Sequence, residues 1–436
     1  MARVRPTSDD WERIREVADA ILTRISDLAE DRGLQAQAML VGSAARGTWL
    51  AGDHDLDIFI AVPEGSDIKD ALSLARAVAP EHEEKYAEHP YVHAAIEGFD
   101  VDLVPCYLLE NTSRLKSAVD RTPFHTRYVL GKIGGLEDQV LLLKQFMKGI
   151  GVYGSELKVG GFSGYLSELL VLRYGSFMGV LEGASGWRPG KIIDLEGGGV
   201  LSHDEPLVVV DPVDPKRNVA AALTLDKMLQ FAASARCFIK GPSLDFFFPG
   251  RIQPLTDEEL IKIMELRRSA FILLEFPAPP VVEDILFPQL RKAEESIRFL
   301  LARNEFSVLR SDVESVNGLA WVLFELDVWE LPRIVRRFGP PAYEGDHLSR
   351  FISSHPHPIS GPYVEGGRAV VEVERKHTKA WDLLEGELPK LSLGKHLAVE
   401  IQKCHSIYVG PAIVTITSPE FKTFLARYFS RGQRIC

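Results

Sequence analysis

Two short segments of this 436-residue chain alternate aspartate with apolar residues, and they restrict the fold more than any other feature. The first segment holds Asp55 and Asp57, and the second holds Asp100 and Asp102. Successive side chains of a β-strand point to opposite faces, so the carboxylates of each pair share one face while the residues between them point into a core. If the two strands are neighbours in a sheet, three or four carboxylates gather on one patch.

An acidic patch of this kind needs a counter-charge. Two carboxylates about 4 Å apart repel each other by roughly 4 kcal/mol at an effective dielectric constant near 20. A divalent cation offsets this repulsion, and ligands that are all oxygen favour Mg²⁺, with Mn²⁺ as the alternative, over zinc. Two such ions can hold an attacking hydroxyl and a leaving phosphate oxygen in line. The pattern therefore predicts a divalent-metal site suited to chemistry at a phosphate.

A glycine-serine turn precedes the first acidic segment. A short apolar run ends at Val41 and leads into Gly42, Ser43 and then Arg46. The Ser43 hydroxyl, nearby backbone N–H groups at a helix N-terminus and the Arg46 guanidinium suit a triphosphate. A Gly-Ser pair alone most often marks a turn with a helix cap, and an Asp-x-Asp pair alone most often marks solvated surface. Their occurrence in order, on consecutive predicted strands, favours a nucleotide site.

The apolar spacing predicts a multidomain chain of α/β and α+β structure. Apolar residues from Trp11 to Leu28 recur every three or four positions, which predicts a helix capped by Ser8 or Asp9 and followed by Gly33. Further elements are expected as helices at 138–148 and 163–181 and as paired strands at 306–316 and 319–327.

Glycines between residues 149 and 164 interrupt the pattern and indicate a domain boundary near residue 150. We therefore expect a head at 1–150, a neck at 151–250, and a body with a tail at 251–436.

The net charge of −11 argues, as a total, against a nucleic-acid binder. Its distribution argues otherwise, because residues 1–110 carry −12 whereas residues 111–180 and the last 36 residues carry +4 each. Basic residues cluster with aromatic or histidine neighbours at 332–338, 375–377 and 422–434. One such cluster alone fits a solvated surface, and together they allow RNA binding in local patches.

The expected compartment is the cytoplasm. No stretch reaches the roughly 18 uninterrupted apolar residues that a membrane span needs, and the N-terminus lacks the apolar core of a secretory signal. The four cysteines at positions 106, 237, 404 and 436 lie far apart, so they form no metal-ligand pair and need no disulfides in a chain of this size. We expect a reduced protein without membrane contact.

The motifs resemble those of the nucleotidyltransferase superfamily related to DNA polymerase β, in which Gly-Ser, Asp-x-Asp and a third aspartate follow one another. More narrowly, the chain resembles the archaeal, class I CCA-adding enzymes (tRNA nucleotidyltransferases) over nearly its full length. The segments that carry this resemblance are 41–50, 101–107, 118–125, 160–168, 211–218 and 337–341. The resemblance implies a polymerase β-like head with a mixed sheet and helices, a helical neck, and an α+β body and tail. Strands beyond residue 270 separate it from the bacterial type, whose remainder is all-helical.

The resemblance also implies residue roles. Asp55, Asp57 and Asp102 match the catalytic, metal-binding carboxylates, of which the first is often glutamate in the family. Asp102 rather than Asp100 aligns with the third, because it directly precedes the Leu-Val-Pro-Cys-Tyr motif. The matched nucleotide contacts are Gly42, Ser43 and Arg46 at the triphosphate, Thr122, His125, Lys144 and Tyr153 at the sugar and phosphates, and Arg217 at the incoming base.

The implied reaction is nucleotidyl transfer to tRNA. The 3′-hydroxyl of tRNA attacks the α-phosphate of CTP or ATP, pyrophosphate leaves, and C, C and A are added without a nucleic-acid template. The carboxyl-terminal half would grip the acceptor stem and TΨC arm by shape, and a homodimer is an open alternative to a monomer. Rival interpretations are a template-free polymerase such as a poly(A) polymerase or an oligoadenylate synthase, and a non-catalytic tRNA-binding protein. The three intact carboxylates argue against the last of these.

Overall fold

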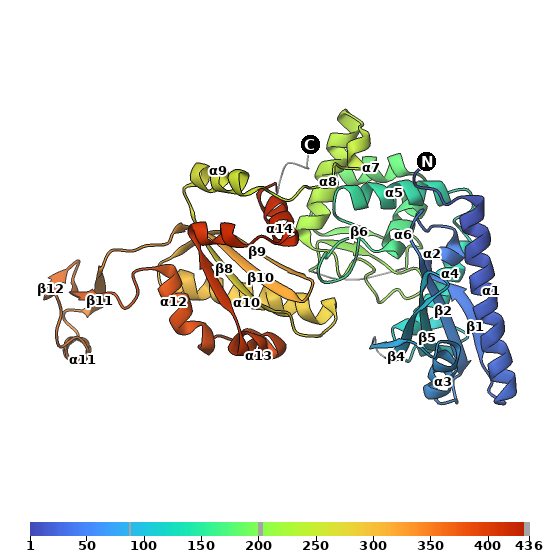
Figure 1. Cartoon of the computed structure of the whole chain (residues 1–436), viewed down its shortest axis with the longest axis horizontal. Helices are drawn as coiled ribbons and strands as arrows, with labels where there is room; N and C mark the ends of the chain where they lie inside the picture. Colours follow the sequence, from blue (N-terminus) through green and yellow to red (C-terminus); the bar gives the residue numbers. More distant parts are fainter. Residues whose placement is uncertain (87–88, 199–203, 431–436) are drawn as a thin grey trace. The chain divides into compact units, whose positions relative to one another are not determined.

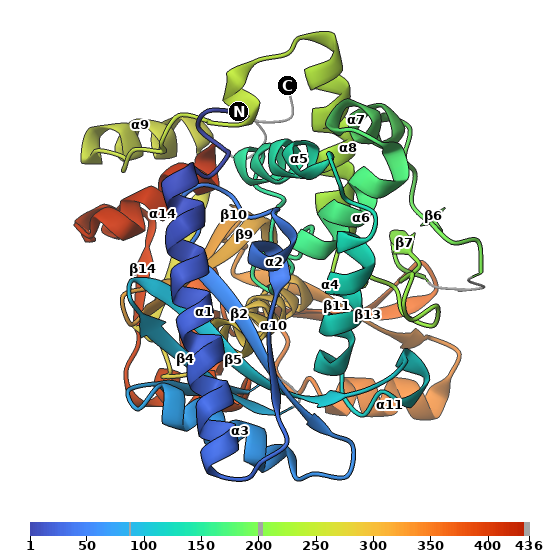
Figure 2. The ribbon, with the colours of Figure 1, turned by 90° about the vertical axis from the view of Figure 1, so that its right-hand side faces the viewer.

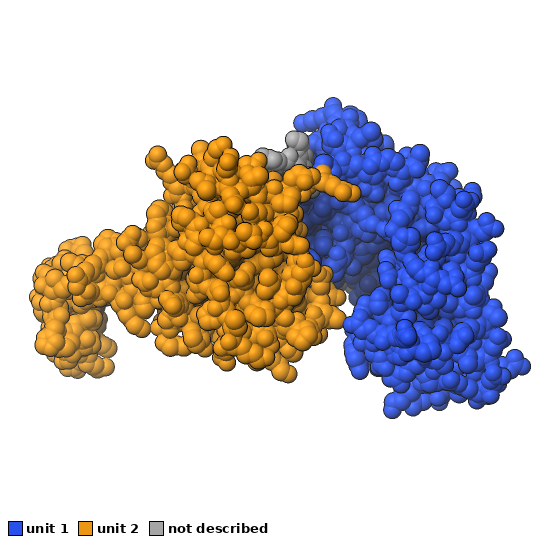
Figure 3. Space-filling model, viewed as in Figure 1, with its two compact units in different colours: residues 1–250, 432–436 blue, residues 251–431 orange. Residues whose placement is uncertain are grey.

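The computed structural model describes residues 1–86, 89–198 and 204–430, in two compact units (Figure 3). Unit 1 is Met1–Gly250, and unit 2 begins at Arg251. Both units combine helices and sheets, so the expected multidomain α/β and α+β class is confirmed. The division of the chain into head, neck, body and tail stays a prediction.

A mixed five-stranded sheet forms the first half of unit 1, in the order β1-β2-β5-β4-β3. Its strands are β1 (Gln37–Val41), β2 (Asp55–Pro63), β3 (Glu83–Tyr86), β4 (Pro90–Ile96) and β5 (Phe99–Leu108). The strands β2 and β5 run parallel, and the other pairs are antiparallel. Helices α1 (Ser8–Asp31) and α3 (Ile68–Val78) cover one face, and Figure 2 shows α1 in front of the sheet, beside β2. The aspartate-bearing face is therefore the opposite one.

Helix α1 begins at Ser8, so the residue that caps it lies before the two residues expected in that role. Thr7 is the N-cap: its hydroxyl accepts from the Asp10 backbone N–H at 3.2 Å, and the Asp10 carboxylate accepts from the Thr7 N–H at 2.7 Å. The expectation that Ser8 or Asp9 caps the helix is wrong, because this reciprocal pair satisfies two N-terminal donors and places both residues inside the first turn. The expected Gly33 follows the helix with a left-handed φ of +62°.

One hydrophobic core extends from Val129 to Phe247 in the second half of unit 1. The helices of this half are α4 (Thr122–Leu130), α5 (Glu137–Gly149), α6 (Gly164–Tyr174), α7 (Phe177–Ser185) and α8 (Leu225–Lys240). The short helix α2 (Gly42–Arg46) belongs to the first half, between β1 and β2. A short parallel pair, β6 (Lys191–Ile193) and β7 (Leu207–Val209), accompanies them. The single helix expected at 163–181 is wrong, because Gly175 takes a φ of +77° and the Ser176 hydroxyl caps a new helix.

Unit 2 contains a four-stranded antiparallel sheet in the order β14-β8-β10-β9. Its strands are β8 (Ala270–Pro277), β9 (Ser307–Val316), β10 (Leu319–Val328) and β14 (Ser406–Val409). Helices α10 (Glu283–Arg303), α12 (Ala380–Glu387) and α13 (Lys395–Lys403) pack on one face, and α9 (Asp257–Arg267) and α14 (Pro419–Phe429) on the other. The pairing of the two strands expected at 306–316 and 319–327 is confirmed.

A second, smaller sheet of unit 2 has the order β11-β13-β12. It is built from β11 (Ile334–Pro341), β12 (Ser360–Glu365) and β13 (Arg368–Glu374), and α11 (Gly345–Ser353) packs on β11 (Figure 1). Gly339 allows this packing, because a β-carbon there would lie 2.6 Å from the Phe351 ring.

The expected reduced state of the cysteines holds in part. Cys106 is buried and free, and Cys404 is exposed and free. The expectation is wrong for Cys237, which is disulfide-bonded, because separation along the chain does not limit proximity in the fold. Cys436 lies outside the described residues. No helix among the residues that the structure describes is both long and apolar enough to cross a membrane.

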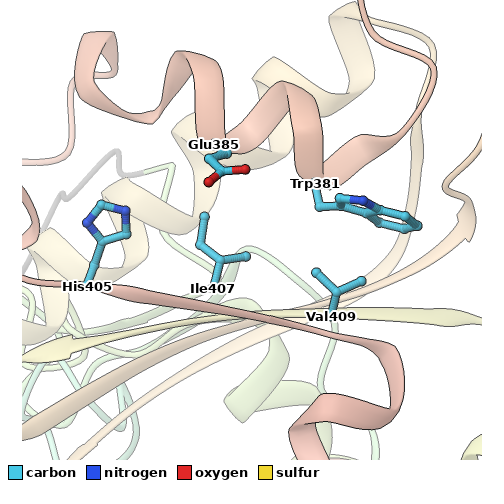
Figure 4. Close-up of a pocket in the computed structure, with 5 residues that line it drawn as sticks. All are labelled: Trp381, Glu385, His405, Ile407 and Val409. Carbon is cyan, nitrogen blue, oxygen red and sulfur yellow. The ribbon is translucent and has the colours of Figure 1, made fainter.

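A pocket of about 210 Å³ lies between α12 and β14 of unit 2 (Figure 4). It is lined by Trp381, Glu385, His405, Ile407 and Val409. None of these side chains is among the residues expected to bind a nucleotide, so the pocket is not part of the site described next.

Candidate active site

The parallel pairing of β2 and β5 brings the predicted carboxylates together. Asp55 faces Asp100 in the register, and Asp57 faces Asp102. Burial, followed by the charge of Asp102, raises the pKa of Asp57 to about 6. Burial, followed by the charges of Asp53, Asp100 and Asp102, raises the pKa of Asp55. Both shifts express the repulsion that the alternation in the sequence predicts.

The turn before β2 lies directly against this patch. Gly42 has a φ of +71°, and a β-carbon at this position would lie 2.1 Å from Asp57 Oδ2. Position 42 therefore requires glycine for two reasons: the left-handed backbone conformation and the lack of space for a side chain. The Arg46 guanidinium, at the end of the same short helix, lowers the pKa of Asp57 and so opposes the other influences on that carboxylate.

The chemistry of this patch fits an oxygen-ligated divalent cation. Its donors are all carboxylates, and two of them have raised pKa values that a cation would lower. Asp102 Oδ1 is hydrogen-bonded to His93 Nδ1 at 2.6 Å. In the described ranges, no three histidine, cysteine, aspartate or glutamate side chains are arranged around a common metal position. The assignment of three metal ligands therefore stays a proposal.

A buried network of charges lies around Arg46. Arg46 Nε donates to Glu168 Oε1 at 3.0 Å, and the Thr48 hydroxyl donates to the same oxygen. Arg46 also donates to the Thr126 hydroxyl, and Lys144 Nζ donates to the Thr48 carbonyl oxygen at 2.8 Å. Arg46 bonds this buried carboxylate directly, and Lys144 is influenced by its charge, so two buried cations lie in a part of the site where they suit a triphosphate.

Lys144 and Tyr153 lie together at the start of α6. A β-carbon at Gly164 would lie 3.2 Å from the Tyr153 hydroxyl and 3.5 Å from Lys144 Nζ. Burial lowers the pKa of Lys144 to about 8, although Glu168 opposes the shift. Burial, followed by the charges of Asp53 and Glu168, raises the pKa of Tyr153. The ammonium is held in the charged form only weakly, so an anionic ligand would stabilise it.

A second buried carboxylate, Asp211, joins two further predicted residues. Asp211 Oδ2 lies 2.9 Å from His125 Nε2 and 2.9 Å from Arg217 NH1. The His125 ring stacks on Tyr165 with ring centroids 4.1 Å apart. Burial lowers the pKa of His125, and the nearby Arg217 and Arg46 add to this effect, while Asp211 opposes it. His125 is therefore predominantly neutral at pH 7.

The remaining predicted residues lie on neighbouring elements. Ser43 is in α2 and Thr122 is the first residue of α4, and these two helices pack together. Both residues are half-buried. All eleven predicted site residues therefore belong to unit 1, and their roles stay proposals.

Sequence reasoning missed the polar residues that hold the predicted ones. Glu168 and Asp211 are fully buried and bond Arg46, His125 and Arg217, but neither was singled out. Both lie at an end of a segment that carries the family resemblance, Glu168 at the end of 160–168 and Asp211 at the start of 211–218. Their position inside motifs was the available signal.

The basic clusters of unit 2 differ from one another in exposure. In 332–338, Arg333 is 77% exposed and Phe338 is 55% exposed, so both are accessible to a partner. In 422–434, Phe424 and Tyr428 of α14 are buried in a hydrophobic core of unit 2. Residues 431–434 lie outside the described residues. These two aromatic side chains are therefore not available to stack on RNA bases, because the apolar face of α14 is used for packing.

Three family models match successive parts of the chain. The nucleotidyltransferase domain matches residues 21–125, the second domain of tRNA nucleotidyltransferase matches 138–248, and the C-terminal domain of CCA-adding enzyme matches 267–410. The fold and the site thus define a nucleotidyltransferase. The solved structure of the Cid1 poly(U) polymerase aligns with 56% of this chain and 92% of its own, with a TM-score of 0.44 and 15% identity.

Three related proteins identify the family to which the chain belongs within this class of enzymes. The CCA-adding enzymes of Methanosarcina barkeri and Methanothermobacter thermautotrophicus are each 43% identical to this chain, over 98% of it and 96% of their own length. The CCA-adding enzyme of Haloarcula marismortui is 38% identical, with the same coverage. The chain belongs to the CCA-adding enzyme family.

Proposed function

We propose that this protein adds C, C and A to the 3′ end of tRNA, and repairs that end, using CTP and ATP without a nucleic-acid template. The observation that carries this proposal is the register of β2 and β5, which sets Asp57 beside Asp102 and against Gly42. An identity of 43% to CCA-adding enzymes over 98% of the chain supports the particular substrates. The match to the CCA-adding C-terminal domain supports tRNA as the acceptor.

Enzymes of the nucleotidyltransferase family use a divalent metal, and here we propose Mg²⁺, with Mn²⁺ as the alternative. Asp55, Asp57 and Asp102 would hold it. When bound, such an ion lowers the pKa of the attacking 3′-hydroxyl and neutralises the charge that develops on the phosphates. The raised pKa values of Asp55 and Asp57 support this role, because both carboxylates gain from a neighbouring cation.

The chain's own cations would bind the triphosphate. Arg46 bonds the buried Glu168 carboxylate, whose charge also acts on Lys144, and phosphate oxygens would add a further counter-charge to both cations. Ser43 and Tyr153 would add hydroxyl donors to the same phosphates. Gly42 would allow the backbone to approach, as it already approaches Asp57.

The sugar and the base would meet the group around Asp211. Thr122 and His125 would contact the ribose, and the 37% exposed Arg217 side chain would contact the edge of the incoming base. Because no nucleic-acid template is present, base selection requires protein groups of this kind together with the bound tRNA end.

Unit 2 would bind the acceptor stem and TΨC arm of tRNA. The exposed Arg333 and Phe338 support this role, since a guanidinium contacts phosphates and an aromatic ring stacks on an unpaired base. With a net charge of −11, binding would be confined to such patches and would weaken as salt is added. The cytoplasmic location and the homodimer stay predictions.

The deciding experiment incubates the protein with tRNA that lacks its terminal CCA, in the presence of both CTP and ATP, and determines the sequence of the RNA products. We expect tRNA ending in C, C and A, with generic RNA left unextended. Extension of any RNA by A alone, with no C incorporated, would instead identify a poly(A)-polymerase-like enzyme. Binding of tRNA without any transfer would identify a non-catalytic binding protein.

A further inference from the structure

We infer that Asp211 is a positioning residue that sets which nucleotides the site accepts, by holding the His125 ring with Nδ1 free for a sugar hydroxyl and by aiming Arg217 at the base. This inference rests on the proposed function, because it concerns the same nucleotide site. It assigns a role to a buried side chain that contacts no substrate.

Every group around the Asp211 carboxylate is a hydrogen-bond donor. Its Oδ2 receives Arg217 NH1 and lies 2.9 Å from His125 Nε2. Its Oδ1 accepts from the Val213 backbone N–H at 3.1 Å and from the Tyr165 hydroxyl at 3.3 Å. Asp211 has no exposed surface, so water does not supply alternatives. The carboxylate is therefore fully used by protein donors.

The tautomer of His125 follows from this arrangement. An ionised carboxylate only accepts hydrogen bonds, so His125 Nε2 must carry the proton that it shares with Asp211. A neutral imidazole with a proton on Nε2 has a lone pair on Nδ1. Burial, which lowers the pKa of His125, favours this neutral form. His125 consequently presents an acceptor, and a hydroxyl group is a suitable donor to it.

The plane of the imidazole ring is fixed as well. The ring lies over Tyr165 with an angle of 25° between the planes, and the Tyr165 hydroxyl returns to the same carboxylate. Among the described residues, Asp211 is the hydrogen-bond partner that the structure gives this ring. Two contacts thus fix the direction of the Nδ1 lone pair, which a hydroxyl must meet to be recognised.

Arg217 depends on the same oxygen. Asp211 and Arg217 close a short loop, in which the Asp211 N–H donates to the Arg217 carbonyl oxygen at 3.1 Å and the Arg217 N–H donates to the Asp214 carbonyl oxygen at 2.9 Å. The guanidinium is 37% exposed and is anchored through NH1, so its other N–H groups remain directed by that anchor. A single carboxylate therefore orients both the sugar contact and the base contact.

The first test needs no substitution. In the intact protein with ¹⁵N-labelled histidine, the nitrogen chemical shifts and proton couplings of His125 report its tautomer, and a His125→Gln variant assigns the signals. We expect a protonated Nε2 and an unprotonated Nδ1 at pH 7.5. A proton on Nδ1 alone, or on both nitrogens, would overturn the inference.

The second test compares nucleotide selectivity in Asp211→Asn. An asparagine has an NH₂ group in place of one of the two carboxylate oxygens. Both oxygens of Asp211 accept from donors, so the NH₂ group faces donors in either orientation and one set of hydrogen bonds is lost. We expect the preference for CTP over 2′-deoxy-CTP or over 3′-deoxy-CTP to fall at least tenfold in kcat/KM, with the affected sugar identifying the hydroxyl. The preference for CTP over UTP should fall at the same time.

The matched control is Asp214→Asn, which removes a carboxylate from the same loop. The Asp214 carboxylate bonds Arg121 at 2.8 Å and the Lys216 backbone N–H at 3.4 Å, neither of which is a proposed nucleotide contact. The backbone bond from Arg217 to the Asp214 carbonyl oxygen is kept in Asp214→Asn, so both selectivity ratios should equal those of the wild type. Unchanged ratios in Asp211→Asn, or equal losses in both variants, contradict the inference. The proposed function would be contradicted by a different result, namely a wild-type protein that transfers no nucleotide to tRNA.

Discussion

Gly42 and Asp57 approach each other so closely that a β-carbon on Gly42 would lie 2.1 Å from Asp57 Oδ2. Such a distance is far below any van der Waals contact, so a side chain at position 42 displaces the carboxylate. The residue that begins the predicted triphosphate turn thus determines where a predicted metal ligand lies. Gly42 and Asp57, fifteen residues apart in the sequence, thus belong to one structural unit.

Replacing this glycine should therefore damage catalysis more than stability. We expect Gly42→Ala to lower kcat/KM for CTP by about 100-fold, since a misplacement of about 1 Å at a reacting centre costs that much. Gly33→Ala is the matched control, because Gly33 has a similar φ of +62° but nothing within 4 Å of the added carbon. Equal losses of activity in the two variants would show that backbone strain, and not the displacement of Asp57, is responsible.

The three carboxylates proposed as metal ligands should be needed for nucleotidyl transfer, whereas their neighbour Asp100 should not. We expect Asp57→Ala and Asp102→Ala to lower nucleotidyl transfer by about 10³-fold or more, because charge stabilisation by a bound metal is worth several kcal/mol. Binding of tRNA, measured by a filter or gel-shift assay, should survive. Asp100→Ala, which removes the exposed register partner of Asp55, should keep transfer within a few-fold of the wild type. An inactive Asp100→Ala with an active Asp102→Ala would reverse the assignment.

The depressed pKa of Lys144 predicts how affinity and stability depend on pH. The free enzyme loses this cation above about pH 8, so kcat/KM for CTP should fall about tenfold between pH 7.5 and 9.5. In Lys144→Arg the guanidinium keeps its charge, so this fall should be absent. The stability of the protein should change in the opposite direction to its activity over this pH range. The Lys144 side chain has a higher pKa in the unfolded chain than in the folded one, so the free energy of unfolding should rise from pH 8 to 10.5. A flat denaturation series across this window contradicts the burial of the ammonium.

Removing the charge of Glu168 should destabilise unit 1. This side chain has no exposed surface, bonds Arg46 and offsets the charge of Lys144, so Glu168→Gln removes the buried anion that these two buried cations have in common. We expect the free energy of unfolding in urea to fall by about 3 to 5 kcal/mol. Glu182→Gln, at an exposed position, should change it by less than about 0.5 kcal/mol. A loss in the first variant no larger than in the second would mean that the network is not needed.

Gly339 should be irreplaceable for the small sheet of unit 2. A β-carbon there would meet the Phe351 ring at 2.6 Å, so Gly339→Ala should push α11 away from β11 and cost about 1 to 3 kcal/mol locally. Gly345→Ala adds the same methyl group in α11, where nothing lies within 4 Å. Hydrogen exchange of amides 334–339 should be faster in the first variant only; unchanged protection would rule out the steric role.

The alternation of polar and apolar residues predicted the elements that carry the site. Strands β2 and β5 and the shared face of Asp55 and Asp57 follow from a period of two, and this prediction is confirmed. Whether the two strands are neighbours was left open by the pattern, and their parallel register comes from the fold. Strand β3 was missed because its residues Glu83–Tyr86 are mostly charged and show no apolar alternation.

The supporting carboxylates were not predictable from local sequence. Glu168 meets Arg46 across 122 residues, and Asp211 meets His125 across 86 residues, so no spacing rule links them. A buried carboxylate is recognised only once its donors are placed around it in space. For a related reason, the helical spacing of Phe424 and Tyr428 does not say whether the protein core or a partner covers the face of α14 that they share.

The strict register of β2 against β5 has a consequence for how the chain reaches its fold. Shifting either strand by one residue would exchange faces, so that Asp57 or Asp102 would enter the apolar layer beneath α1 and α3. Burying an unpaired carboxylate there costs several kcal/mol, which makes each one-residue misalignment an unstable competitor during folding. The acidic residues proposed for catalysis therefore also act as markers of correct strand alignment, and a chain that has misaligned its sheet loses its stability together with its chemistry.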